Sequence, residues 1–196
     1  MVANANELIE MLLMEYNMLI PITCQNNGDY LGNYFNMSTK RIGLRGEVYY
    51  GNRQRDYAVA LHEFGHALQY KNKPFFMSLF RWYKALFPFL IGGTIIANEI
   101  VHYTEWLNYA IGVILYLCYS IILVLIEHNA SQKAIHVILE YNLYNKYGVL
   151  LDQVTATLKN NTRIYLVSTI SGFIALFGVL PLFLHLLMNI SSLRIK

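Results

Sequence analysis

The chain has 196 residues, of which 56% are hydrophobic and only 14% are charged, and its formal net charge at pH 7 is +3. This length predicts one domain over residues 1–196. The mean hydropathy of +0.34 is high for a soluble protein and the apolar residues are clustered, which indicates a membrane protein. The slight excess of positive charge is explained by membrane topology, so nothing indicates nucleic-acid binding.

The N-terminal segment predicts an amphipathic helix rather than a signal peptide. Leu8, Leu12 and Tyr16 fall at helical spacing, and no lysine or arginine precedes Lys40. A signal peptide would begin with a basic region. The helix is expected to pack on the rest of the domain or to lie on the membrane surface.

Residues 40–50 predict a short strand only weakly, because Gly43 interrupts it. One interpretation is an edge strand to which an extended peptide substrate adds. The other is a surface hairpin that covers the helix that follows.

The sequence HEFGH at residues 62–66 is the most informative pattern in the chain. Small apolar residues surround it, which predicts a buried helix that begins near Asp56 or Asn52 and ends before Pro74. Histidines at positions i and i+4 lie one turn apart on one helical face, where both imidazoles reach one metal ion. The intervening Glu63 then lies beside the metal-bound water, as in zinc peptidases.

Three apolar stretches predict transmembrane helices. Residues 106–126 and 165–188 contain no charged side chain, and residues 85–101 form a shorter candidate. Thirteen of the fifteen lysines and arginines fall in residues 1–84 and 127–164. By the positive-inside rule, these two regions and the HExxH sequence are expected on the cytoplasmic side.

A membrane hairpin over residues 85–126 would return the chain to the side of His62 and His66. A catalytic zinc takes three protein ligands and keeps one position for water, so a third ligand is expected. Glu127 stands at the end of an uncharged span, where a carboxylate is costly unless it is paired or bound to metal. The spacing does not separate it sharply from the other candidates, which are His128, His136 and Asp152.

Two motifs carry a family resemblance. The run AVALHEFGHALQ at residues 58–69, the apolar hairpin, and then EHNASQKA at residues 127–134 resemble the YugP-type family of membrane neutral zinc metallopeptidases. Residues 33–51 are similar to that family's short β-hairpin. The resemblance implies His62, His66 and Glu127 as ligands of one Zn²⁺ per chain, and Glu63 as the general base.

The order of parts also resembles that of the HtpX-type membrane gluzincins, which are quality-control or processing proteases. In their motif an aspartate stands where this chain has Ser131. Asn129 and Ser131, close behind Glu127, are candidates to orient the imidazoles.

The expected fold is mainly α: a polytopic membrane protein with about three transmembrane helices, a small cytoplasmic zincin-like part and a short β-hairpin. Its parts are 1–84 with the HExxH helix, the membrane hairpin 85–126, cytoplasmic helices over 127–164, and the last span 165–188. A continuous helix is expected over 129–147, with its stop at Gly148.

The expected function is a membrane-embedded zinc endopeptidase whose site faces the cytoplasm. The alternative is a catalytically silent membrane protein with a structural metal site, against which the intact Glu63 argues. The expected partners are a peptide or protein substrate and the lipid bilayer. Small residues such as Ser168 and Gly172 suggest close helix packing within the chain or in a homo-oligomer.

Overall fold

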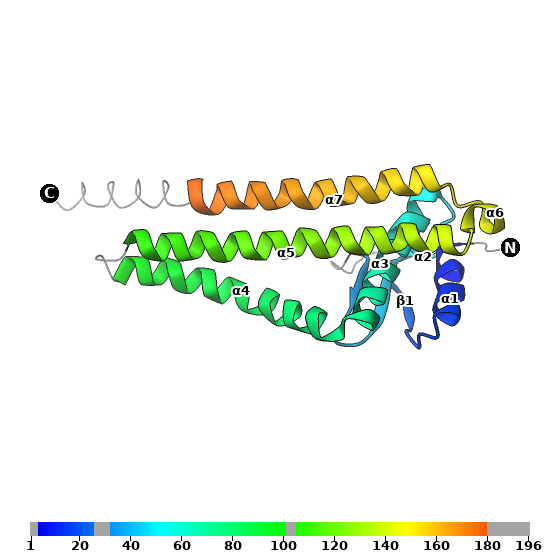
Figure 1. Cartoon of the computed structure of the whole chain (residues 1–196), viewed down its shortest axis with the longest axis horizontal. Coiled ribbons are helices and arrows are strands. Elements are labelled where there is room, and N and C mark those ends of the chain that lie inside the picture. The colour runs from blue at the N-terminus through cyan, green and yellow to red at the C-terminus, as the bar shows by residue number, and fades with distance from the viewer. Residues whose placement is uncertain (1–3, 26–31, 101–104, 180–196) are drawn as a thin grey trace. The chain divides into compact units, whose positions relative to one another are not determined.

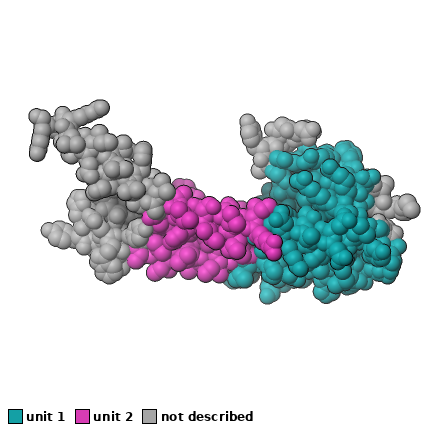
Figure 2. Space-filling view, turned by 90° about the horizontal axis from the view of Figure 1, so that it is seen from above, with its two compact units in different colours: residues 1–81, 125–162 teal, residues 82–124, 163–196 magenta. Residues whose placement is uncertain are grey.

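The computed structural model describes residues 4–25, 32–100 and 105–179 (Figure 1). This part of the chain is mainly helical with one small sheet, as predicted. Contacts divide the chain into two compact units, residues 1–81 with 125–162 and residues 82–124 with 163–196 (Figure 2). Three helices contribute segments to both units: α4 (Pro74–Ile100), α5 (Glu105–Glu140) and α7 (Leu151–Ile174).

The sheet of the first unit has three strands: β1 (Ile22–Gln25), β2 (Tyr34–Asn36) and β3 (Arg41–Arg45). Their order is β1-β3-β2, with β1 parallel and β2 antiparallel to β3. The edge-strand interpretation of residues 40–50 is therefore wrong, and the hairpin interpretation is correct. Gly43 does not weaken β3, because the Tyr34 ring lies where a side chain at Gly43 would be. Residues 46–49 form a short helix, α2 (Gly46–Tyr49).

The N-terminal helix, α1 (Ala5–Glu15), packs on α3 (Gln54–Asn72). Leu8 and Leu12 are fully buried in the core they share, whereas Leu19 beyond the helix is fully exposed. Asn4 caps the helix by accepting a hydrogen bond from the Glu7 backbone N–H at 3.0 Å. Of the two placements predicted for this helix, packing on the domain is confirmed.

Helix α3 carries the HExxH sequence and is buried along most of its length, as predicted. Asp56 closes its first turn from the third helical position, where the carboxylate accepts the Arg53 backbone N–H at 3.2 Å. The helix ends at Asn72, and Pro74 begins α4, because proline is tolerated in the first turn of a helix. The helix that carries the two histidines thus has defined ends at Gln54 and Asn72.

The second half of α5 joins the core of the first unit, where Ala134, Val137 and Ile138 are buried. The helix expected over residues 129–147 is wrong at one point, because α5 ends at Glu140 and α6 (Leu143–Tyr147) follows. Asn142 adopts the left-handed conformation (φ 48°), which asparagine tolerates better than most residues. The stop at Gly148 (φ 70°) is confirmed.

The second unit is held by aromatic contacts among α4, α5 and α7. The rings of Phe87 and Tyr119 stack with centroids 4.2 Å apart. The Tyr116 hydroxyl donates a hydrogen bond to the Thr169 carbonyl at 2.8 Å and lies against Gly172. Gly172 of α7 therefore allows close packing within the chain.

In the described part of the chain, one helical stretch, Ala110–Glu140, is long and apolar enough to cross a membrane. It includes most of the predicted span 106–126. The prediction of three spans is not confirmed, and the end of the predicted last span, residues 180–188, lies outside the described residues.

Candidate metal centre

Helices α3 and α5 bring His62, His66 and Glu127 together. Their ligand atoms all lie within 4.8 Å of one another. The Glu127 carboxylate oxygen Oε2 is 3.1 Å from His62 Nε2 and 3.4 Å from His66 Nε2. The two imidazoles stand nearly perpendicular, with ring centroids 4.8 Å apart. The two histidines of α3 and the glutamate of α5 thus converge on a single candidate metal site.

This geometry fits a zinc ion. Two ligand atoms bound at about 2.0–2.2 Å in a tetrahedral arrangement lie roughly 3.3 Å apart. The two measured separations between Glu127 and the histidines, 3.1 and 3.4 Å, bracket this value. The donor set of two imidazole nitrogens and one carboxylate oxygen is one that catalytic zinc sites use, with one position left for water.

The outer nitrogen of each imidazole has its own partner. Ser131 Oγ is 3.2 Å from His62 Nδ1, and Gln69 Oε1 is 2.9 Å from His66 Nδ1. Since an amide oxygen only accepts, the Gln69 contact requires a proton on His66 Nδ1 and directs the Nε2 lone pair at the centre. Both contacts therefore orient the rings for metal binding.

Gln69 also ties the two helices together. Its side-chain amide nitrogen donates to the Ile126 backbone carbonyl at 2.7 Å and to Asn129 Oδ1 at 3.0 Å. Asn129 therefore acts on His66 only through Gln69, whereas Ser131 touches His62 directly. One side chain fixes the ring of His66 and the position of the helix that carries Glu127.

Close contact of the two helices depends on Gly65. The backbone of Ala130 on α5 lies where a side chain at Gly65 would be, and a Cβ there would be 2.9 Å from the Ala130 carbonyl carbon. Glycine allows two helical backbones to approach this closely. The fourth residue of HEFGH thereby lets Glu127 reach the histidines.

Glu63 is 7% exposed, and burial raises the pKa of its carboxyl above the ordinary value. The charges of His66 and His62 and a hydrogen bond from the Phe35 backbone N–H oppose that effect. The pKa of His66 is also raised: burial would lower it, but the hydrogen bond and charge of Glu127 outweigh burial. In the folded chain the Glu63 carboxyl therefore takes up a proton more readily than an exposed glutamate does.

The other candidates for a third ligand lie elsewhere. His128 is exposed and lies 3.5 Å from Gln132, and His136 is exposed and lies 3.6 Å from Glu140. Asp152 is exposed in the first turn of α7. Neither histidine nor the aspartate joins the group of three.

Two contacts of the site escaped the sequence analysis. Gln69 carried a detectable signal, because it lies three residues after His66 and hence beside it on the helical surface. The sequence contained no signal for the contact of the Phe35 N–H with Glu63, because this contact results from the packing of the sheet on α3.

A family model described as "putative neutral zinc metallopeptidase" matches residues 3–184. Searches of curated proteins and of solved structures return no match to the chain.

Proposed function

Because the chain belongs to the putative neutral zinc metallopeptidase family, we propose that it is a membrane-embedded zinc endopeptidase whose site faces the cytoplasm. The observation that carries the proposal is the convergence of His62, His66 and Glu127 beside the buried, non-ligating carboxyl of Glu63. A structural zinc site has no use for such a carboxyl group, whereas peptide hydrolysis needs a base.

In the proposed reaction His62, His66 and Glu127 hold the ion, and Ser131 and Gln69 keep the imidazoles oriented. A bound zinc ion supplies Lewis acidity, which lowers the pKa of a coordinated water toward about 7 and polarises a carbonyl. Glu63 accepts the proton of the attacking water and returns it to the leaving amine nitrogen. Burial moves the pKa of this carboxyl upward, which is the direction that favours a general base, because a base works best when its pKa is near the operating pH.

Strand β2 supports a peptide as the substrate. It pairs only with β3 among the described strands, so no described strand covers its other edge, where an extended peptide could add. Its Phe35 also donates its backbone N–H to Glu63, so the strand runs beside the proposed base. An extended peptide added to β2 would lie close to the catalytic carboxyl.

The membrane placement rests on the apolar stretch Ala110–Glu140 and on the positive-inside rule. We assign spans to residues 85–101, 106–126 and 165–188, with residues 1–84 and 127–164 in the cytoplasm. Carbonate extraction of membranes tests the embedding, and proteolysis of sealed vesicles from either side tests the orientation.

The decisive experiment is hydrolysis of an unfolded protein substrate by the full chain, purified in detergent and loaded with zinc. We expect new peptide ends, mapped by mass spectrometry, that vanish with a chelator. We also expect no cleavage by Glu63→Gln, although that variant should bind as much zinc as the wild type. Cleavage by Glu63→Gln at the wild-type rate would contradict the assignment of the base. Zinc binding without hydrolysis of any substrate would favour the silent protein with a structural metal site.

A further inference from the structure

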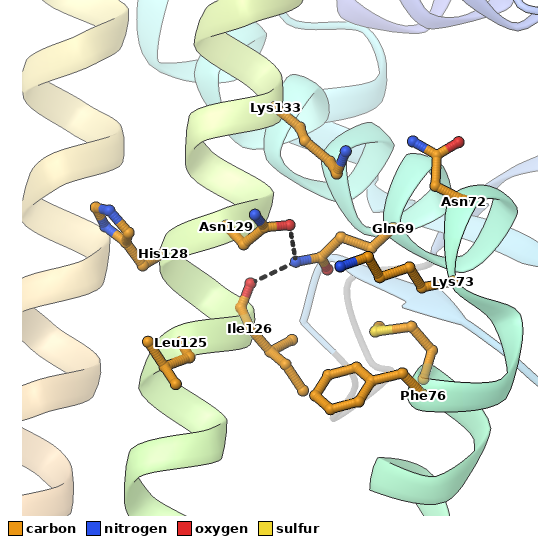
Figure 3. A pocket seen from close by; sticks show the side chains of 10 residues that line it. Gln69, Asn72, Lys73, Phe76, Leu125, Ile126, His128, Asn129 and Lys133 are labelled. Atoms are coloured by element: carbon orange, nitrogen blue, oxygen red, sulfur yellow. Dashed lines mark hydrogen bonds between the residues drawn. The ribbon is translucent and has the colours of Figure 1, made fainter.

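A pocket of about 480 Å³ opens beside the metal centre in the first unit, between the start of α4 and the middle of α5 (Figure 3). Its volume falls in the range of about 300–1,000 Å³ that is typical of small-molecule sites. Gln69, the residue that orients His66, forms part of its wall. The pocket is thus adjacent to the metal centre but contains none of the three candidate ligands.

The lining is divided by chemical character. Lys73 and Lys133 line its polar side, whereas Phe76 and Leu125 line its apolar side, where they lie together at one end of the pocket in Figure 3. We call it the two-lysine pocket. Such a division suits a ligand with an anionic head and an apolar tail.

The two lysines are available for a ligand. Within the described residues neither forms an ion pair with a carboxylate, and no acidic side chain lines the pocket. Lys133 is partly buried, so part of its hydration shell is already lost. Two ammonium groups without a counter-charge at one pocket attract an anion.

The pocket also lies where the uncharged part of α5 ends. The uncharged part of α5 ends at Ile126, and the pocket runs from Leu125 to Lys133 along that helix. In the membrane placement proposed above, this is the level at which phospholipid headgroups meet acyl chains. A free soluble anion would have no use for the apolar side of the pocket.

We propose that the two-lysine pocket binds an anionic phospholipid, with the phosphate on Lys73 and Lys133 and the start of an acyl chain against Phe76 and Leu125. Basic pockets between helices on the cytoplasmic side of a membrane suit anionic headgroups. The bound lipid lies against Gln69 and so supports the residue that connects His66 to α5. The proposal rests on the membrane placement and does not depend on peptidase activity.

The test compares lipid retention by the full-length chain and two double variants. Lys73→Gln/Lys133→Gln removes the charge of the pocket, and Lys159→Gln/Arg163→Gln removes the same charge from exposed positions of α7. Each protein is reconstituted in phosphatidylcholine vesicles that contain phosphatidylglycerol as the anionic probe. Native mass spectrometry then counts the lipids that remain bound after detergent extraction. Helical content and zinc content establish that each variant is folded.

We expect the wild type and the α7 variant to retain phosphatidylglycerol in preference to phosphatidylcholine. In the pocket variant the preference should fall about 30-fold, since each lysine near an anionic surface contributes roughly five-fold. Equal retention by both variants would overturn the proposal. So would displacement of the lipid by inorganic phosphate, which would show a phosphate site. Displacement of the lipid by a glutamate-rich peptide would also overturn the proposal, because it would show that the pocket binds a peptide substrate.

Discussion

Replacement of Gly65 by alanine tests whether the contact of α3 with α5 builds the metal centre. The added Cβ would clash with the Ala130 carbonyl oxygen, the atom nearest to it, and would lie 2.9 Å from the Ala130 carbonyl carbon; ordinary contacts begin at 3.4 Å, so the shortfall is at least 0.5 Å. Both obstructing atoms belong to the α5 backbone, which cannot rotate away as a side chain can. The two helices must therefore separate by at least 0.5 Å.

A bound zinc ion cannot keep all three ligands when the two helices move apart by this much. Distances between zinc and its ligands hold to within about 0.2 Å, so a 0.5 Å displacement of Glu127 from the histidines exceeds the tolerance. The metal-free chain relieves the clash by letting the helices part, but the zinc-bound chain does not. Overpacking strain of about 1–3 kcal/mol then falls on the bound state and lowers zinc affinity about 5- to 150-fold.

The assay is competition for zinc between the detergent-purified chain and a fluorescent chelator. Gly92→Ala is the matched control, because a Cβ added to this α4 glycine meets no atom within 4 Å. We expect the control to bind zinc as the wild type does and Gly65→Ala to bind it less tightly. Wild-type affinity in a folded Gly65→Ala variant would refute the claim that this contact sets the position of Glu127.

Three further substitutions test the surroundings. Glu127→Gln should abolish stoichiometric zinc binding, measured by elemental analysis, because a neutral amide replaces the anionic ligand; full retention would exclude Glu127 as a ligand. Gln69→Leu should weaken zinc binding about 10- to 100-fold in the same chelator competition, because His66 loses its hydrogen-bond partner, and an unchanged affinity would contradict its orienting role. Gly148→Ala should lower thermal stability by roughly 1 kcal/mol with zinc binding intact, because only the positive φ of 70° opposes the new side chain. No loss of stability would show that the helix stop does not depend on glycine.

The sequence predicted those parts of the site that depend on residues close together in the chain. The spacing of His62 and His66 is a property of one helix, and it holds wherever that helix is packed. Glu127 was recognisable because a carboxylate at the end of an apolar stretch is costly without a partner. The family resemblance added the preference for Glu127 over His128.

What the sequence did not predict depends on contacts between distant segments. Gly65 looked like one small residue among several, and only the Ala130 backbone explains why a glycine stands there. The pairing of β1 with β3 brings together strands of four and five residues, too short for a clear alternating pattern. The break at Asn142 lets Leu143 enter the core, a gain that no local propensity encodes.

The last prediction concerns the stability cost of the proposed base. Burial raises the pKa of Glu63, which means that the folded chain disfavours its charged form. Below about pH 4.3, the ordinary pKa of glutamate, the carboxyl is protonated in both the folded and the unfolded chain, and burial of a charge costs nothing. As the pH rises toward the raised pKa, the unfolded chain ionises freely and the metal-free folded chain loses stability.

Glu63→Gln removes the charge and keeps an oxygen that accepts the Phe35 N–H. The chelator-treated variant should therefore unfold at a higher temperature than the metal-free wild type at neutral pH, and the difference should shrink on acidification below pH 5 or so. Thermal unfolding followed by circular dichroism across this pH range measures both effects. A variant that is less stable at every pH would mean that the Glu63 carboxylate holds the fold together. The expected pattern, combined with lost hydrolysis and retained zinc, would mean that the chain keeps a destabilising carboxyl group for its chemistry.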